Sequence, residues 1–319
     1  MLAGQPGYQK TVIVNDLPLH LNAPINIYPE QELNARSFIQ GGPRDQIYEL
    51  GKKIVKGNFS FPILINKDGD VDEPVKEILE CAQYPMRTLT IKTNYVLAKR
   101  YVTADIKDYR DMTDNVGFNV YSKMTFECCA VTKLTISVSE TENVSANAEI
   151  ISLVSETPII NIPALSSTGM MRRQVNYAEC DVYLTFPSYH WDTSKSFSIS
   201  IENTIEPIYN FIKDNDKQTW TDLPVAMAMG ESHVYGDITY SVDRGSAASE
   251  KLTLPTGGWL GRNLIFDISG VILIDIPHCI ANLTQQPIEL GLLQRKTEFK
   301  ALFNTTNLDA VEGHFITFK

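Results

Sequence analysis

The sequence lacks the features that identify most enzymes, membrane proteins and secreted proteins. No apolar run approaches the ~20 residues that a membrane-spanning helix requires. The first residues lack the charged and apolar segments of a signal peptide. The chain also has no GxSxG elbow, no GxGxxG turn and no Walker A loop. We therefore expect a protein that is made and kept in the cytoplasm, does not associate with a membrane and is not an enzyme.

Cysteine and histidine are scarce, which argues against disulfides and metal sites. The chain has five of each, and neither residue type occurs at a metal-ligand spacing. Free cysteine behaves as a small hydrophobic residue, so we expect buried thiols and no cofactor or metal. The cysteines are Cys81, Cys128, Cys129, Cys180 and Cys279.

Basic residues are outnumbered by acidic ones. Lys and Arg total 28 against 38 Asp and Glu, which gives a formal net charge of −10. Proteins that grip nucleic acid do so with clustered Lys and Arg, so the composition disfavours that function. An acidic protein can still lie beside DNA if its task is to avoid sticking to it.

Patterns typical of β-strands dominate the rest of the sequence. Residues 134–139 and 144–150 alternate apolar and polar side chains on either side of a polar turn, which predicts a hairpin with one buried face. Residues 197–202 and 264–276 have the same character. One helix is expected over 72–82, with Asp72 as N-cap. Residues 203–212 are expected to form a loop because they contain Pro207.

A short phrase occurs twice. Gly51, Val55 and Gly57 are repeated as Gly230, Val234 and Gly236, an offset of 230 − 51 = 179 residues. Glycines of this kind mark places where a strand bulges or another backbone approaches closely. The repeat indicates two copies of one β unit.

The fold class predicted from these patterns is mainly β, with two tandem β-sandwich or barrel domains and one or few short helices. The linker is placed where Pro and Ser accumulate between the copies. The predicted division is an N-terminal arm over 1–25, a first domain over 26–155, a linker over 156–172 and a second domain over 173–319.

The order of these motifs resembles the tail tube proteins of tailed bacteriophages. The glycine phrase at 51–57, the short helix and the strand text at 126–138 follow one another as in that family, and the strand at 196–203 precedes the second glycine phrase. The closing text at 287–304 is similar to the family's terminal strand. The likeness covers residues 30–319 in order, except that the second copy has no clear counterpart of the helix.

The resemblance implies two tube-like domains and a mechanical function in the virion tail. Subunits of this kind join edge strands into rings, and stacked rings form a conduit through which genomic DNA is ejected. A chain with two such domains implies trimeric rings of pseudo-six-fold symmetry, or hexamers. The implied partners are other copies of the chain, a tape measure protein and genomic DNA in the lumen, and a sheath or neighbouring tail proteins.

The resemblance also directs the choice of candidate residues. The segment 32–48 is too apolar for a free loop, and the arm and this segment are expected to contact other subunits. The expected interface residues are Phe38, Ile39, Ile47, Tyr48, Arg172 and Arg173. An acidic bore is expected to let DNA slide, and its candidate residues are Glu140, Glu142, Glu149 and Glu202.

Two alternatives remain at this stage. The first is a related tail terminator, distal tail or baseplate hub ring. The second is a carbohydrate-binding β-sandwich, which would require Trp191, Trp220 and Trp259 to converge on one face.

Overall fold

The structure is a computed structural model that describes eleven stretches of the chain. These are residues 10–23, 26–37, 46–96, 121–156, 172–185, 188–190, 194–209, 224–242, 262–285, 293–301 and 316–319. The linker expected over 156–172 lies almost entirely outside them.

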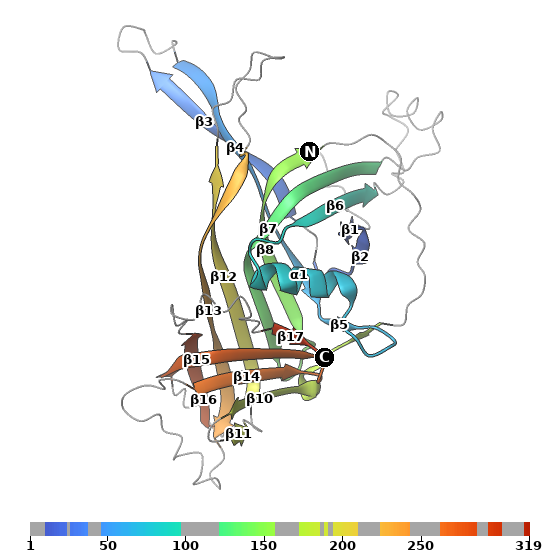
Figure 1. The fold of residues 1–319 in the computed structure, drawn as a ribbon, viewed down its shortest axis with the longest axis vertical. Helices are drawn as coiled ribbons and strands as arrows, with labels where there is room; N and C mark the ends of the chain where they lie inside the picture. Colours follow the sequence, from blue (N-terminus) through green and yellow to red (C-terminus); the bar gives the residue numbers. More distant parts are fainter. Residues whose placement is uncertain are drawn as a thin grey trace, which may run out of the picture.

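Strands make up most of the described chain, with a single α-helix among its elements (Figure 1). The predicted mainly β class is therefore confirmed. The strands of the N-terminal half are β1 (Lys10–Val14), β2 (Leu17–Leu19), β3 (Asn26–Ser37), β4 (Gln46–Pro62), β5 (Leu64–Ile65), β6 (Leu89–Val96), β7 (Tyr121–Ser139) and β8 (Ser145–Glu156). Those of the C-terminal half are β9 (Arg173–Gln174), β10 (Cys180–Thr185), β11 (Ser188–His190), β12 (Ser194–Ile208), β13 (Ala226–Val242), β14 (Arg262–Ile268), β15 (Ile272–Gln285), β16 (Leu293–Ala301) and β17 (Ile316–Phe318).

The two halves repeat one strand order. In the first half the paired order is β3-β4-β8-β7-β6-β1-β2, and in the second it is β12-β13-β16-β15-β14-β10-β11. Counterpart strands also occur in the same order along the chain in the two halves, and every one of these pairings is antiparallel. Such agreement over seven strands indicates that the halves are copies of one unit.

The irregularities of the sheet are repeated as well. Gly51 lies in the bulge that interrupts the β3–β4 pairing, and Gly230 lies in the bulge that interrupts the β12–β13 pairing. Gly57 and Gly236 come next, each in the middle of a strand that is paired on both sides. The structure therefore places the two glycine phrases at equivalent positions.

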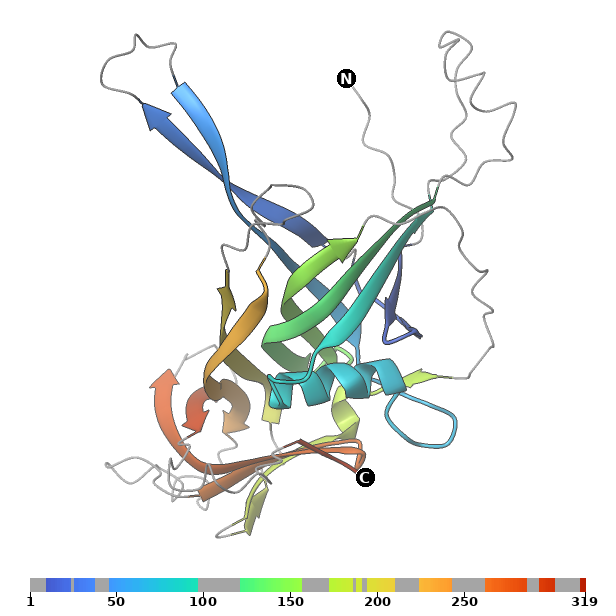
Figure 2. The ribbon, with the colours of Figure 1, turned by 45° about the horizontal axis from the view of Figure 1, so that its top comes forward.

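One strand pair joins the halves into a single 15-stranded sheet. Residues 133–139 of β7 pair with residues 196–202 of β12 in antiparallel register. Buried residues from both halves form one continuous core beneath this junction. The β3–β4 hairpin extends well beyond that body (Figure 2).

The helix α1 (Glu73–Gln83) covers the core side of the sheet, as expected from its sequence. Its apolar side chains, which include Val75, Ile78 and Leu79, are fully buried. Asp72 is at the N-cap position, but its side chain makes no capping hydrogen bond. Asp72 instead forms an ion pair with Arg172, whose Nε lies 3.0 Å from Oδ1.

Two details of the strands differ from the sequence expectations. Residues 10–19 lie in the stretch 1–25 that was expected to form an arm, but they are strands of the sheet because Val12, Val14 and Leu19 enter its core. β12 continues through Pro207 instead of ending in a loop. Proline is tolerated there because the pairing of β12 with β7 has already stopped at Glu202, which leaves this part of β12 at an edge.

The cysteines also divide differently from the expectation. Cys81, Cys129 and Cys279 are buried, as expected, whereas Cys128 is exposed. Cys128 adopts a φ of 51° at an irregularity in β7, which turns it away from the strand alternation. Cys180 is of intermediate exposure.

Candidate functional site

The face of the sheet opposite α1 is lined by short polar side chains. Residues directly opposite one another in antiparallel strands place their side chains on the same face, so the pairings define rows that cross both halves. One row joins Ser60, Asn147, Thr135, Ser200 and Tyr235, and the next joins Ser145, Ser137, Ser198, Asp237 and Glu298. We call this surface, with the neighbouring rows through Glu149 and Ser139, the polar wall.

The alternation of β7 and β12 explains how the wall arises. In β7, Leu134 and Ile136 are at most 1 % exposed and point into the core, whereas Thr135 and Ser137 between them face the other side. β12 repeats the pattern, with Ser198 and Ser200 between buried apolar residues. The hydroxyls of Thr135 and Ser200 are 3.0 Å apart and hydrogen-bonded, so the wall is continuous across the junction of the halves.

Charges on the described part of the wall are nearly balanced. Its acidic residues are Glu149, Glu202, Asp237 and Glu298, and its lysines are Lys133, Lys296 and Lys300. Lys296 and Asp237 form an ion pair of 3.4 Å. An acidic bore remains a prediction for an assembled ring, since the described part of one chain has an excess of only one carboxylate on this face.

A polar cluster marks the junction of the halves on the wall. The hydroxyl of Tyr235 donates a hydrogen bond of 2.8 Å to Glu202, and the ammonium of Lys133 lies 5.9 Å from the centre of the Tyr235 ring. The Tyr235 hydroxyl beside Lys133, helped by the carboxylate of Glu202, raises the pKa of the lysine. The cluster therefore holds one charge of each sign across the β7–β12 boundary.

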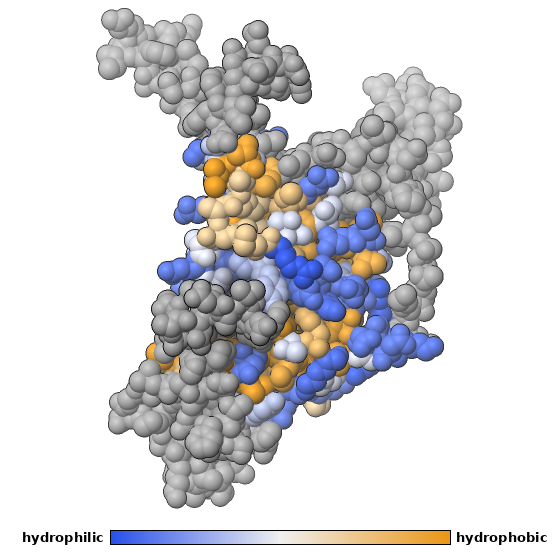
Figure 3. Space-filling model, viewed as in Figure 1, coloured by the Kyte–Doolittle hydropathy of each residue, from blue (hydrophilic) through white to orange (hydrophobic). Residues whose placement is uncertain are grey.

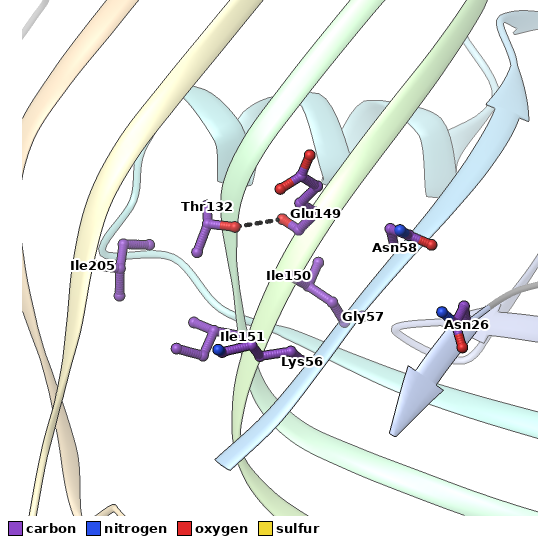
Figure 4. Close-up of a pocket in the computed structure, with 9 residues that line it drawn as sticks. All are labelled: Asn26, Lys56, Gly57, Asn58, Thr132, Glu149, Ile150, Ile151 and Ile205. Carbon is purple, nitrogen blue, oxygen red and sulfur yellow. Dashed lines mark hydrogen bonds between the residues drawn. The ribbon is translucent and has the colours of Figure 1, made fainter. Parts of the chain in front are cut away.

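Two hollows on the sheet lie over the repeated glycines. The first, of about 340 Å³, is lined by residues around Gly57, including Asn58 and Glu149, with α1 behind the strands (Figure 4). The second, of about 570 Å³, surrounds Gly236 and includes Asp237 and Glu298. Neither hollow is lined by a nucleophile paired with a base.

The acidic candidates fall in two places. Glu149 and Glu202 lie on the wall and are exposed, as the bore hypothesis requires. Glu140 and Glu142 lie in the turn between β7 and β8, at one end of the wall, where Glu140 forms an ion pair of 3.2 Å with Lys195. The structure thus brings two of the four together on the wall.

The arginines expected at an interface make contacts within the chain. Arg172 is only 16 % exposed and pairs with Asp72, whose own pKa is raised because burial of the carboxylate outweighs the attraction of the arginine. Arg173 pairs with Glu179 and also donates a hydrogen bond to Ser269. These contacts fasten the end of the linker to both halves.

The remaining interface candidates belong to the β3–β4 hairpin. Ile47 and Tyr48 pair with Arg36 and Ala35 in the part of the hairpin that lies beyond the bulge. Phe38 and Ile39 lie outside the described residues. The interface assignments of these residues remain predictions.

An apolar patch at the end of the β12–β13 hairpin was missed from the sequence. Ile208 and Val225 are 43 % and 44 % exposed and are joined by a backbone hydrogen bond of 2.9 Å. Ala226, Met227 and other partly exposed apolar residues continue the patch, which Figure 3 shows at the upper end of these strands. The unbroken run of apolar residues over 225–229 was a signal, but nothing in the sequence shows that this end projects from the body.

Comparisons with known proteins leave the family open. Neither the protein-family models nor the curated proteins that were searched gave a match. Within the described ranges, no helix has the length and apolar character to cross a membrane, and no group of three or more His, Cys, Asp or Glu is arranged to hold a metal ion. Trp191, Trp220 and Trp259, on which the carbohydrate-binding alternative depends, lie outside those ranges.

Proposed function

We propose that this protein is a structural subunit of a bacteriophage tail, which self-assembles into rings that stack into a tube for the passage of genomic DNA. The observation that carries the proposal is the polar wall. Its hydroxyl and amide side chains are able to hydrogen-bond to water, and its nearly balanced charges provide no basic cluster that would hold phosphates in place. A surface of this kind suits a conduit along which DNA slides.

The repeated architecture supports ring formation. The halves are joined by strand pairing in a head-to-tail manner, and head-to-tail contacts that close by rotation generate rings. Three copies of a chain with two such units would supply six units to a ring. Closing the ring would also remove the open sheet edges that promote uncontrolled aggregation.

This function places the protein in the virion tail, with other copies of itself, a tape measure protein and DNA as partners. A tail terminator, a distal tail ring or a baseplate hub shares the same wall and ring. Tube length separates these roles, because a terminator or hub forms single rings whereas a tube protein stacks indefinitely.

The direct test is electron microscopy of the purified protein at increasing concentration. We expect rings with a central hole and, at higher concentration, tubes whose axial repeat equals the height of one ring. A chain that stays monomeric at every concentration, by light scattering and by microscopy, would contradict the proposal. Single rings that never stack would favour the terminator or hub.

Stacking is expected to depend on the apolar end of the β12–β13 hairpin. The halves are joined side by side through strand pairing, so the strands run roughly perpendicular to the direction in which the halves follow one another around a ring. The ends of the strands would therefore face the next ring of the stack. Replacing both Ile208 and Val225 by Ser should weaken stacking by roughly 100-fold, since burying each side chain contributes about 1.5 kcal/mol and about 1.4 kcal/mol corresponds to tenfold.

The readout is the protein concentration at which tubes appear. Met86→Ser is the matched control, because Met86 is 84 % exposed on another part of the surface. Tubes that form at the same concentration in the double variant and in the control would show that this patch is not the stacking contact.

A further inference from the structure

The junction between the halves shows how one unit receives the next. In the first half, β6 ends its pairing with β7 at Leu89 opposite Cys129, and β7 continues past that point. The flank that β6 leaves open, residues 133–139, is taken by β12 of the second half. The opposite flank of β7 is occupied by β8.

The second half repeats this arrangement with the receiving flank open. β14 ends its pairing with β15 at Arg262 opposite Cys279, and β15 continues to Gln285. Its other flank is occupied by β16, as β8 occupies β7. Among the described residues, no strand pairs with 280–285 on the side that β14 leaves open.

The strand that would pair with this flank is β3, and one of its own edges is also open. β3 is the counterpart of β12, because each pairs with the glycine-containing strand of its half: Ile27 lies opposite Gly57 as Ile199 lies opposite Gly236. β12 uses its second edge to pair with β7. The second edge of β3 has no partner strand among the described residues.

We propose that these two edges pair between copies of the chain, so that β3 of one copy adds to the 280–285 flank of β15 in the next. The internal junction fixes the register. Lys133 opposite Glu202 corresponds to Asn282 opposite Glu30, and the next row places Leu283 opposite Pro29. The partner is a second copy of this chain, and the proposal rests on the self-association that the proposed function requires.

The contacts of Glu30 support its equivalence to Glu202 of the internal junction. Glu30 forms an ion pair of 3.0 Å with Lys56, the residue that corresponds to Tyr235, and Tyr235 holds Glu202 in the same way at the internal junction. Pro29 accepts hydrogen bonds through its carbonyl but has no N–H to donate.

Engineered cysteines test the proposed pairing of β3 with residues 280–285 of the next copy, which we call the seam, and its register. The variant Glu30→Cys/Asn282→Cys, made with Cys128→Ser to remove the exposed native thiol, should form disulfides between chains on mild oxidation. Lys133→Cys/Glu202→Cys occupies the equivalent internal row and calibrates the reaction within one chain. Burial raises the pKa of Cys81 and Cys129 to about 12, so these native thiols remain protonated and unreactive.

The expected result is specific to a head-to-tail seam. An equimolar mixture of the Glu30→Cys and Asn282→Cys single variants should yield disulfide-linked dimers only, whereas the double variant should yield a ladder that stops at the number of copies in a ring. Glu30→Cys/Ile280→Cys, displaced by two residues, should cross-link at least tenfold more slowly.

Two results would overturn the proposal and would be told apart by light scattering. Assemblies that form without cross-linking, or that cross-link the displaced pair equally well, would reject the seam while the proposed function stands. A double variant that remains monomeric, together with a monomeric unmodified chain, would reject both.

Discussion

Replacing Gly236 by alanine is expected to be among the most destabilising single substitutions in the described chain. A Cβ at this position would lie 1.9 Å from the carbonyl oxygen of Ser198 and 2.7 Å from Cζ of Phe299. The first of these atoms belongs to the neighbouring strand, so relief requires β12 and β13 to move apart. We expect a loss of at least about 3 kcal/mol in the free energy of unfolding, at the upper end of the usual cost of overpacking.

The repeat predicts the same outcome at Gly57. A Cβ there would lie 2.7 Å from the backbone oxygen of Asn26 and 2.8 Å from Cα of Ile27. Gly230→Ala is the matched control, since its closest contact would be a side-chain atom of Thr204 at 3.1 Å, and it should cost less than about 1 kcal/mol. Urea denaturation of the three variants measures the difference. Equal losses at all three sites would mean that the close approach of the strands is not what requires glycine.

These glycines show why part of the fold was readable from the sequence. A close approach between backbones excludes every side chain, so the requirement appears directly as a residue type at a fixed spacing. The helix α1 and the β7–β8 hairpin were also predicted correctly, because amphipathic periodicity and alternation are local signals. Each of these features is determined by residues that are near one another in the chain.

The strand order could not be predicted from such signals. The pairing of β7 with β12 brings together residues such as Leu134 and Ile201, and no local pattern specifies that partner. The same holds for β1, whose partner β6 is far away in the sequence. Pro207 misled the prediction because proline breaks a strand only where its N–H is needed, and that depends on whether a second neighbour is present.

The candidate site was predicted only in part, because some of its residues follow from local alternation and others from the strand pairing. Glu149 and Glu202 alternate with buried residues, so their position on a polar face followed from the sequence. The lysines beside them, including Lys133 and Lys300, come from other strands and enter the wall only through the pairing. Arg172 was expected at an interface, but a buried partner at Asp72 draws it against the helix.

Asn203 gives the clearest case of a residue whose importance only the structure reveals, and its replacement by alanine should cost about 3 kcal/mol. The side chain is 4 % exposed. Its amide donates hydrogen bonds to the carbonyl of Ala82 at 2.9 Å, in the last turn of α1, and to the carbonyl of Val131 at 3.0 Å, in β7. Its oxygen accepts a hydrogen bond of 2.6 Å from Ser232. Asn203 thereby ties the second half to the helix and central strand of the first.

The expected loss follows from the groups that alanine would leave without partners. Two buried carbonyls and a hydroxyl would lose their hydrogen bonds, and each unsatisfied group costs roughly 1–3 kcal/mol. Ser232→Ala removes one bond only and should cost about 1 kcal/mol, while Asn147→Ala, on the exposed wall, should stay within about 0.5 kcal/mol. Thermal and urea unfolding measure all three.

Asn203→Asp separates the hydrogen bonds from the packing, because it keeps the shape but faces two carbonyl oxygens with a carboxylate. Burial and these oxygens should raise the pKa of the introduced acid in the folded state above its unfolded value. The folded state then binds the proton more tightly, so the penalty is largest at neutral pH and shrinks as the pH falls through the raised pKa. A penalty that does not change with pH, or an Asn203→Ala variant as stable as Asn147→Ala, would show that the two halves are held together by the core and the strand pairing alone.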